Sequence, residues 1–146
     1  MTSTASEPGW APIAILVGRV IFLGIFIMAV SFKFMDINGT AGYIAMAGFP
    51  APLFLAWCAA IFEVLLVLGF LTGAYFAETC LLAGVYVIFL AFAFHGPSHW
   101  QGDMMQYEFG FFVDHFTFLA GLLFAAVHGP GRILASRKTI IGRYPA

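Results

Sequence analysis

The sequence predicts an all-α integral membrane protein in which four transmembrane helices form a bundle. Hydrophobic residues make up 62% of the 146 residues and charged residues only 9%, and the mean hydropathy is +0.99. These values lie far outside the range of soluble domains. Unbroken apolar runs such as LLAGVYVIFLAFAF (residues 81–94) lack the alternation of apolar and polar positions that membrane β-strands require. We therefore expect one helical membrane domain over residues 1–146.

Four apolar segments have about the 17–25 residues that cross the hydrocarbon core as a helix. They run from Pro12 to Phe34, Pro52 to Leu71, Tyr75 to Phe94 and Phe109 to His128. No basic residue precedes the first segment, and this segment is too long for an ordinary signal-peptide core, so we expect it to stay as a membrane helix. Residues 72–75 (TGAY) then form a tight turn, and residues 35–51 and 95–108 form the connections at the opposite face.

The orientation is predicted by the C-terminal stretch GPGRILASRKTIIGRYPA (residues 129–146). It holds Arg132, Arg137, Lys138 and Arg143, four of the six basic residues in the chain. The positive-inside rule places this end in the cytoplasm, and with four spans the N-terminus is cytoplasmic too. The GPG at its start is typical of a helix stop, in which Gly and Pro end the fourth span.

Two ionisable residues, Asp114 and His115, lie side by side in the apolar run FFVDHFTFLAGLL (residues 111–123). Asp114 shares a helical face with small and polar residues, which favour close helix contact over lipid. These neighbours are Gly110, Thr117, Gly121, Ala125 and His128. We expect Asp114 to face protein, with Lys33, His95 or a water as its partner. His115 points about 100° away, and we favour a histidine bonded within a helix interface over a ligand.

A second polar set is predicted nearer the cytoplasmic side. Arg19 lies seven residues into the first span and Glu63 eight residues before the end of the second, which places both roughly 10–12 Å below the same surface. We therefore expect Arg19 and Glu63 to pair, with Glu78 as the competing partner of Arg19. Lys33 reaches the outer edge, near Asp36 and Asp114. Such charges inside a bundle are either functional or purely architectural, and the sequence leaves both readings open.

The four histidines of the chain do not predict a metal or haem site. The loop HGPSHWQGDMM (residues 95–105) offers His95 and His99 beside Asp103, Met104 and Met105, but the spacing matches no defined metal site, so we expect no metal. His115 and His128 stand thirteen residues apart on one span, as in membrane haem proteins, yet suitable second axial ligands are lacking.

The two cysteines, Cys58 and Cys80, lie inside different spans at different depths. This offset exceeds the roughly 7 Å between Cα atoms that a disulfide allows. We expect both to be free and buried among apolar residues.

Several motifs together resemble the DoxX family of small four-helix membrane proteins. They are GR at residues 18–19, FKFMDINGTAGYIAMAGFPAP at 32–52, IFEVLLVLGFLTGAY at 61–75 and DHFTFLAGLLFAAVHGPGR at 114–132. The resemblance implies that the matching polar positions are Arg19, Lys33, Glu63 and the GPGR exit of the fourth helix. This chain has Asp114-His115 where relatives often carry a Lys-Asn pair.

The resemblance implies a role in membrane redox chemistry, since some family members are subunits of quinone-reducing enzymes that oxidise sulfur compounds. We therefore expect a membrane subunit of a quinone-linked oxidoreductase in the bacterial inner membrane. Arg19 and Glu63, or Asp114 and His115, would hydrogen-bond quinone carbonyls and relay protons. Quinone is the expected cofactor, none is expected to be covalently bound, and a partner complex would supply the electrons. No nucleic-acid partner is expected.

Two alternatives remain open. One is an accessory subunit that packs against a larger membrane complex and does no chemistry, and the other is a small-solute permease. Four short helices leave little room for a path unless several copies assemble, which disfavours the permease. Whether the chain itself catalyses a reaction is left open by the sequence.

Overall fold

The structure is a computed structural model that describes residues 8–141 and residue 144. Its helices are α1 (Ala11–Met35), α2 (Ile37–Met46), α3 (Pro52–Thr72), α4 (Phe76–His95) and α5 (Met105–His128). Two short 3-10 helices, η1 (Pro97–His99) and η2 (Gly102–Met104), connect α4 to α5. α1, α3, α4 extended through η1, and α5 extended through η2 are long and apolar enough to cross a membrane. The predicted four-span helical fold is therefore confirmed.

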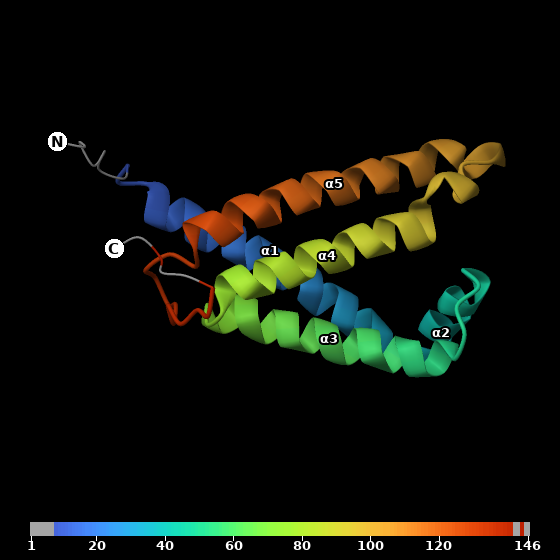
Figure 1. The fold of residues 1–146 in the computed structure, drawn as a ribbon, viewed down its shortest axis with the longest axis horizontal. Helices are drawn as coiled ribbons and strands as arrows, with labels where there is room; N and C mark the ends of the chain where they lie inside the picture. Colours follow the sequence, from blue (N-terminus) through green and yellow to red (C-terminus); the bar gives the residue numbers. More distant parts are fainter. Residues whose placement is uncertain (1–7, 142–143, 145–146) are drawn as a thin grey trace.

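The long helices associate as two pairs. α1 packs along α3 and α4 packs along α5, while the short α2 lies against the start of α3. Figure 1 shows that the pairs lie close together at one end of the bundle and diverge toward the other. We call the diverging end the α2 end and the opposite one the tail end. α1 begins and α5 finishes at the tail end, as an even number of spans requires.

Helix α2 lies within residues 35–51, for which the sequence predicts a connection between spans. Its sequence, INGTAGYIAM, contains two glycines and few strong helix formers. Asp36 supplies an N-cap, because its carboxylate accepts a hydrogen bond from the Gly39 N–H at 2.8 Å. Ala41 and Ile44 are buried against Ala56 of α3. Capping and packing thus form a helix that propensity alone does not predict.

The turn between α3 and α4 is tight and is set by glycine. Gly73 follows α3 with φ +67°, a left-handed conformation that favours glycine, and its N–H bonds to the Gly69 carbonyl. One turn earlier, Gly69 itself lies directly against the Thr79 side chain of α4. The missing side chain at residue 69 therefore lets the two helices approach closely.

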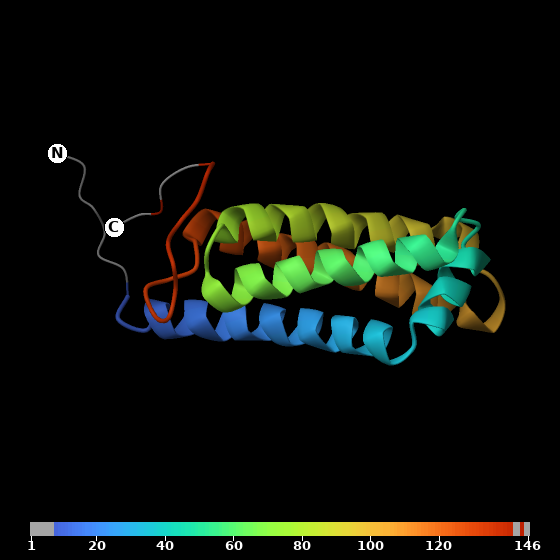
Figure 2. The ribbon, with the colours of Figure 1, turned by 90° about the horizontal axis from the view of Figure 1, so that it is seen from below.

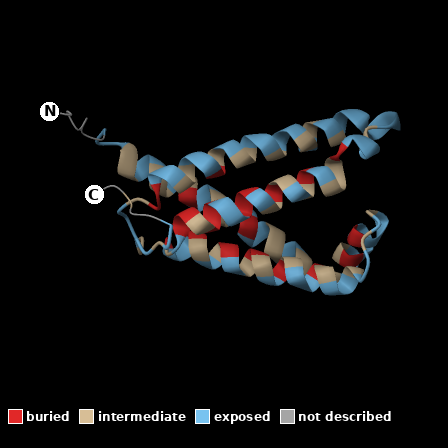
Figure 3. Ribbon diagram, in the orientation of Figure 1, coloured by how far each residue is buried: buried red, intermediate tan, exposed pale blue. Residues whose placement is uncertain are grey.

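Five phenylalanines join all four spans near the tail end. Phe26 stacks on Phe70 with ring centroids 5.5 Å apart, Phe22 and Phe118 lie 5.2 Å apart, and Phe76 meets Phe70 edge-on at 5.7 Å. We call this set the phenylalanine layer. Buried residues concentrate on α3 and α4, whereas much of α1 and α5 is exposed (Figure 3). Exposed apolar side chains on the spans are what lipid contact requires.

Residues 129–141, the tail segment, fold back across the tail end. At the tail end, α1 extends beyond the α3–α4 turn. Figure 2 shows the tail segment occupying the space that this difference in length leaves. Backbone hydrogen bonds fix it there, from Ser136 N–H to the Thr72 carbonyl at 2.8 Å and from Tyr75 N–H to the Lys138 carbonyl at 2.7 Å. The tail segment is therefore part of the folded bundle.

Candidate functional site

A buried polar network joins three helices. The Lys33 ammonium of α1 lies 2.8 Å from Glu63 Oε1 of α3, and the Tyr86 hydroxyl of α4 donates to the same oxygen at 2.8 Å. Glu63 is only 2% exposed, and the Lys33 side chain is 18% exposed. An ionised carboxylate at such burial needs these partners.

The helix geometry explains why Lys33 reaches Glu63. Lys33 lies in the last turn of α1, at the α2 end. Side chains on a helix tilt toward its N-terminus, so the four-carbon stem of Lys33 runs back into the bundle. Glu63 lies two turns from Phe70 on the buried face of α3 that also holds Ala56 and Ala60. The ammonium and the carboxylate meet between these two helices.

One oxygen of the network has no partner. Glu63 Oε2 is buried and accepts no hydrogen bond from the described residues. An unsatisfied buried acceptor costs about 1–3 kcal/mol, so such a group requires an explanation. Lys33 retains N–H donors beyond the one directed at Oε1. The site can therefore accept a hydroxyl proton at Oε2 and donate to a carbonyl from Lys33.

The predicted pairing of Arg19 with Glu63 is wrong. Arg19 Nη1 donates to the carbonyl oxygens of Pro130 at 2.9 Å and Ile133 at 3.2 Å, and Nη2 donates to that of Leu134 at 2.7 Å. Arg19 and Glu63 lie at similar distances from the ends of their helices but at different depths. The last turn of α3 is set back from the first turn of α1, and the tail segment occupies the space between them (Figure 2). Arg19 and Glu63 therefore lie on opposite sides of the phenylalanine layer.

The predicted competitor, Glu78, also bonds to the tail segment rather than to Arg19. Glu78 Oε1 accepts from the Thr139 hydroxyl at 2.8 Å and from the backbone N–H groups of Ile140 and Ile141. Arg19 and Glu78 thus fasten the same segment from two helices. In this fold both residues hold the tail segment in place. Arg143, the fourth basic residue of the predicted cytoplasmic stretch, lies outside the described residues.

Neither of the two side chains predicted as partners of Asp114, Lys33 and His95, contacts it. Asp114 is exposed and forms no hydrogen bond or ion pair with any described residue. Phe118, one turn along α5, contacts Phe26 of α1, so Asp114 projects from the side of α5 that faces α1. The helix pairs diverge toward the α2 end, which leaves that side of α5 uncovered (Figure 1). Lys33 and His95, its expected partners, are engaged by other carboxylates.

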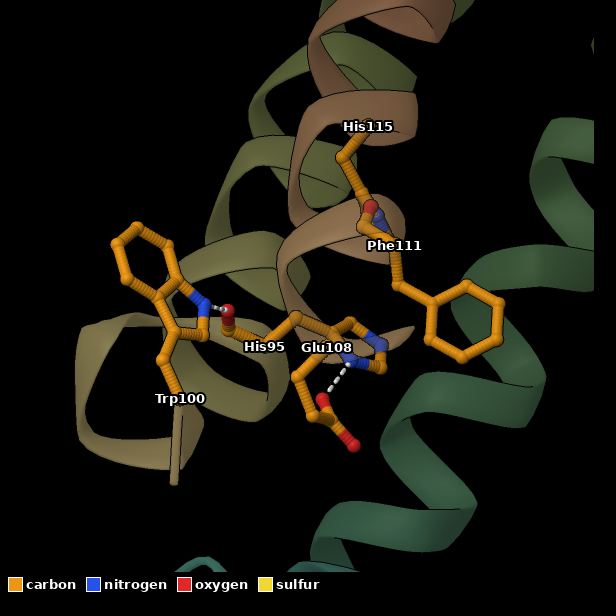
Figure 4. Close-up of polar contacts among 5 residues, drawn as sticks. All are labelled: His95, Trp100, Glu108, Phe111 and His115. Carbon is orange, nitrogen blue, oxygen red and sulfur yellow. Dashed lines mark hydrogen bonds and ion pairs between the residues drawn. The ribbon is translucent and has the colours of Figure 1, made fainter. Parts of the chain in front are cut away.

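A second polar cluster lies at the α2 end (Figure 4). His95 Nδ1 is 2.7 Å from Glu108 Oε2, and the Trp100 indole N–H donates to the His95 carbonyl at 2.9 Å. The His115 ring lies 5.2 Å from the His95 ring, and its Nδ1–H donates to the Phe111 carbonyl at 2.6 Å. The cluster ties α4 to α5 and leaves the second ring nitrogen of each histidine available.

Tyr43 of α2 borders the same cluster. Its ring stacks on Phe94 with centroids 4.9 Å apart. Burial, and secondly the Glu108 carboxylate, raise the pKa of the Tyr43 hydroxyl above its usual value of 10.0. Tyr43 and Glu108 were not singled out from the sequence, and neither was Tyr86. The signal available for Tyr86 is a phenol in the middle of an apolar span, which requires a hydrogen-bond partner when buried.

Neither metal nor disulfide chemistry is brought together in the described part of the chain. No three His, Cys, Asp or Glu side chains there lie close enough to hold an ion. His95, one of the two weak candidates, is bonded to Glu108, and His99 lies in the exposed η1 turn. Cys80 is free and buried as predicted, whereas Cys58 is free but exposed, so its predicted burial is wrong.

Comparison with known proteins places this geometry in a family. The family model described as DoxX matches residues 14–96, more than half of the chain. The chain belongs to the DoxX family. The matched region contains Lys33, Glu63 and Tyr86, whereas Asp114 and His115 lie beyond it. The buried network is therefore part of the DoxX region of this chain.

A relative with similar length supports the same assignment. The DoxX chain is 31% identical over 134 residues to the inner membrane protein YphA of Escherichia coli K12, covering 87% of this chain and 91% of that protein. No solved structure matches the chain significantly. With four spanning helices and this relative, the DoxX chain is a multi-pass protein of the bacterial inner membrane.

Proposed function

We propose that this DoxX protein is the membrane subunit of a quinone-linked oxidoreductase and that Lys33, Glu63 and Tyr86 hold the quinone headgroup. The observation that supports this most directly is the unpartnered Glu63 Oε2 beside the Lys33 ammonium. Asp114 and His115 are less suited as the primary site, because Asp114 is exposed and His115 Nδ1 is bonded to the Phe111 carbonyl of its own helix.

The donor and acceptor set suits a quinone headgroup. A quinone carbonyl needs a donor, and the hydroxyl of its reduced form needs an acceptor. Lys33 supplies the donor and Glu63 Oε2 the acceptor. The Lys33 side chain is partly exposed at the α2 end and Glu63 is buried, so a headgroup would approach the pair from the Lys33 side. When bound, the quinone would supply the two-electron, two-proton chemistry, with the electrons coming from a partner complex.

Each residue has a distinct part in this proposal. The Lys33 ammonium, 2.8 Å from Glu63 Oε1, balances the charge of the carboxylate in a region of low dielectric. The Tyr86 hydroxyl donates to Oε1, which fixes the carboxylate and directs Oε2 away as the free acceptor. Glu63 Oε2 can then take a proton as a general base. The phenylalanine layer separates this site from the tail end.

The test requires the chain in its native complex. The complex is extracted gently from membranes of the organism, and the retained quinone and the quinone-reductase turnover are measured for the wild type and the double variant Lys33→Met/Glu63→Leu. The double variant removes both charges and so avoids a stranded ion. We expect the complex to assemble but to lose quinone and turnover. An assembled variant complex with undiminished turnover would contradict the proposal.

Tyr86→Phe provides a finer comparison. It keeps the ring and removes only the donor to Oε1, so we expect assembly and quinone retention with a lower turnover. Arg19→Gln serves as the control for a structural defect, since Arg19 lies across the phenylalanine layer. A loss of assembly without a change in turnover per assembled complex is expected there.

The alternative is an accessory subunit that packs on a larger membrane complex without chemistry of its own. The observation that favours it is that Lys33, Glu63 and Tyr86 bind one another, which an architectural ion pair would also do. Co-purification with a partner but without quinone, and a double variant that behaves as wild type, would establish this function instead.

A further inference from the structure

The tail segment is a rigid element that carries charge. Within residues 129–141 there are three basic side chains, Arg132, Arg137 and Lys138, and no acidic one. Its backbone is fixed to α1 through Arg19, to α3 through Thr72, and to α4 through Tyr75 and Glu78. These hydrogen bonds hold the segment against three helices, so it keeps one surface at the end of the bundle; Glu78 Oε2 is buried without a partner among the described residues.

The outward surface of the tail segment combines cations with apolar side chains. Arg132, Arg137 and Lys138 are all exposed. Beside them, Leu134 is 81%, Ile140 79% and Ile141 58% exposed. The two arginines keep their positive charge whatever they also contact within the chain. Large apolar residues this exposed at the end of a membrane bundle lie where headgroups and acyl chains meet.

The opposite end of the bundle has no such surface. Residues 36–51 and 96–108 contain Asp36, Asp103 and Glu108 but no lysine or arginine. The charge difference between the two ends therefore comes from the tail segment. A cationic surface with interspersed apolar residues is complementary to an anionic lipid interface.

We propose that the tail segment is a binding surface for anionic phospholipid headgroups. Arg132, Arg137 and Lys138 contact the lipid phosphates, and Leu134 and Ile140 insert among the glycerol and upper acyl groups. The four adjoining spans hold the segment at the depth of the headgroups, which favours lipid over a soluble acidic partner. The inference is independent of the quinone proposal and of which side of the membrane the tail end occupies.

The experiment uses the full-length protein in detergent, with thermal unfolding followed as phosphatidylglycerol or phosphatidylcholine is added. We expect phosphatidylglycerol to raise the unfolding temperature well above the value with phosphatidylcholine, and salt to reduce the difference. Each basic residue contributes roughly fivefold to the apparent affinity for anionic lipid. The triple variant Arg132→Gln/Arg137→Gln/Lys138→Gln should therefore lose most of the preference.

Two further variants separate the contributions. Arg132→Lys/Arg137→Lys retains the charge and should retain the preference. Leu134→Gln/Ile140→Gln should weaken binding of both lipids and leave the salt dependence in place. Inorganic phosphate alone should stabilise the wild type little, because it lacks the apolar part.

Three outcomes would overturn the inference. The first is equal stabilisation of the wild type by both lipids, which can be measured even if the triple variant does not fold. The second is a folded triple variant with an unchanged preference for phosphatidylglycerol. The third is stabilisation by free phosphate or by an acidic polymer that matches that by the anionic lipid.

Discussion

The Lys33 ammonium lies 2.8 Å from the Glu63 carboxylate on one side of a layer of phenylalanine rings, and Arg19 lies on the other side bonded to main-chain carbonyls. The layer separates the charges of the bundle into two independent groups. One group pairs Lys33 with Glu63 between α1 and α3, and the other, which contains Arg19 and Glu78, fastens the tail segment. Each group has one buried carboxylate oxygen without a partner among the described residues. Substitutions in the two groups should consequently have different effects.

Removing one member of the Lys33–Glu63 pair should destabilise the protein more than removing both. Lys33→Met or Glu63→Leu alone strands a buried charge, at a cost on the order of 3–5 kcal/mol. The double substitution should recover most of that stability. Thermal or denaturant unfolding in detergent measures the three variants. A double variant whose loss of stability equals the sum of the two single losses would show that the pair contributes no coupling.

Arg19→Gln should release the tail segment without disturbing the Lys33–Glu63 pair. Three main-chain carbonyls lose a charged donor, and hydrogen bonds to charged groups contribute about 1.5–3 kcal/mol each. Arg19→Lys should rescue poorly, because an ammonium lacks the planar fork that reaches several acceptors. Hydrogen exchange of residues 129–141 is the readout. Lys138→Gln is the control, because Lys138 helps to hold the segment through its backbone carbonyl and not through its side chain.

Glu108→Gln should lower the pKa of Tyr43 toward the ordinary tyrosine value without fully restoring it, because burial is the larger cause of the increase. A raised pKa in the folded state means that Tyr43 contributes stability below the pKa of unfolded tyrosine. This contribution is lost as the pH rises through the folded-state pKa. The total loss should be smaller in the variant and should level off at a lower pH, because only the folded-state pKa changes. Absorbance of tyrosinate, measured against the same background with Tyr43→Phe, isolates this residue.

His95→Gln provides the matched control for that titration. It removes the partner of Glu108 but keeps the carboxylate charge, so the pKa of Tyr43 should remain raised. If His95→Gln lowers it as much as Glu108→Gln does, the effect comes from loosening of the cluster rather than from the charge.

Gly69→Ala should destabilise the protein by about 1–3 kcal/mol, as overpacking of a close contact does. A methyl group at residue 69 would overlap the Thr79 side chain of α4. Gly24→Ala in α1 is the control, because no atom lies within 4 Å of the corresponding methyl position. Alanine at residue 24 should be neutral or stabilising. Similar losses at both sites would argue against close packing of α3 on α4.

Reporter fusions after residues 35–51 and at the C-terminus test the orientation. The cytoplasmic placement of the tail end stays a prediction from the basic residues, and fusions at the C-terminus should report the cytoplasm. A periplasmic signal there would reverse the orientation without changing which residues contact one another.

The sequence predicts where each transmembrane helix begins and ends, but not how far neighbouring helices are shifted along one another. Hydrophobic length and helix-breaking residues locate each span to within a few residues, because these are local properties. The pairing of Glu63 depends on how far α3 is shifted along α1, and the tail segment that occupies the resulting step lies more than sixty residues away along the chain. Counting residues from predicted ends therefore placed Arg19 beside the wrong partner. Tyr86 could not be predicted from charge, because a tyrosine is neutral and is common in apolar spans.

Divergence of the helix pairs explains the exposure of Asp114. Its position on a face of small and polar residues correctly indicated the side of α5 that faces α1, as the contact of Phe118 with Phe26 shows. A helical wheel gives the direction of a side chain, but it does not indicate whether a neighbouring helix is close enough to cover it.

The hydrogen bonds of Arg19 impose an order on biosynthesis. Arg19 enters the membrane with the first span, but the carbonyls of Pro130, Ile133 and Leu134 emerge from the ribosome only after all four spans have been made. Throughout insertion the guanidinium must be solvated by water, lipid phosphate or the insertion machinery. A chain that stops soon after His128 would leave the Arg19 guanidinium permanently without these three acceptors.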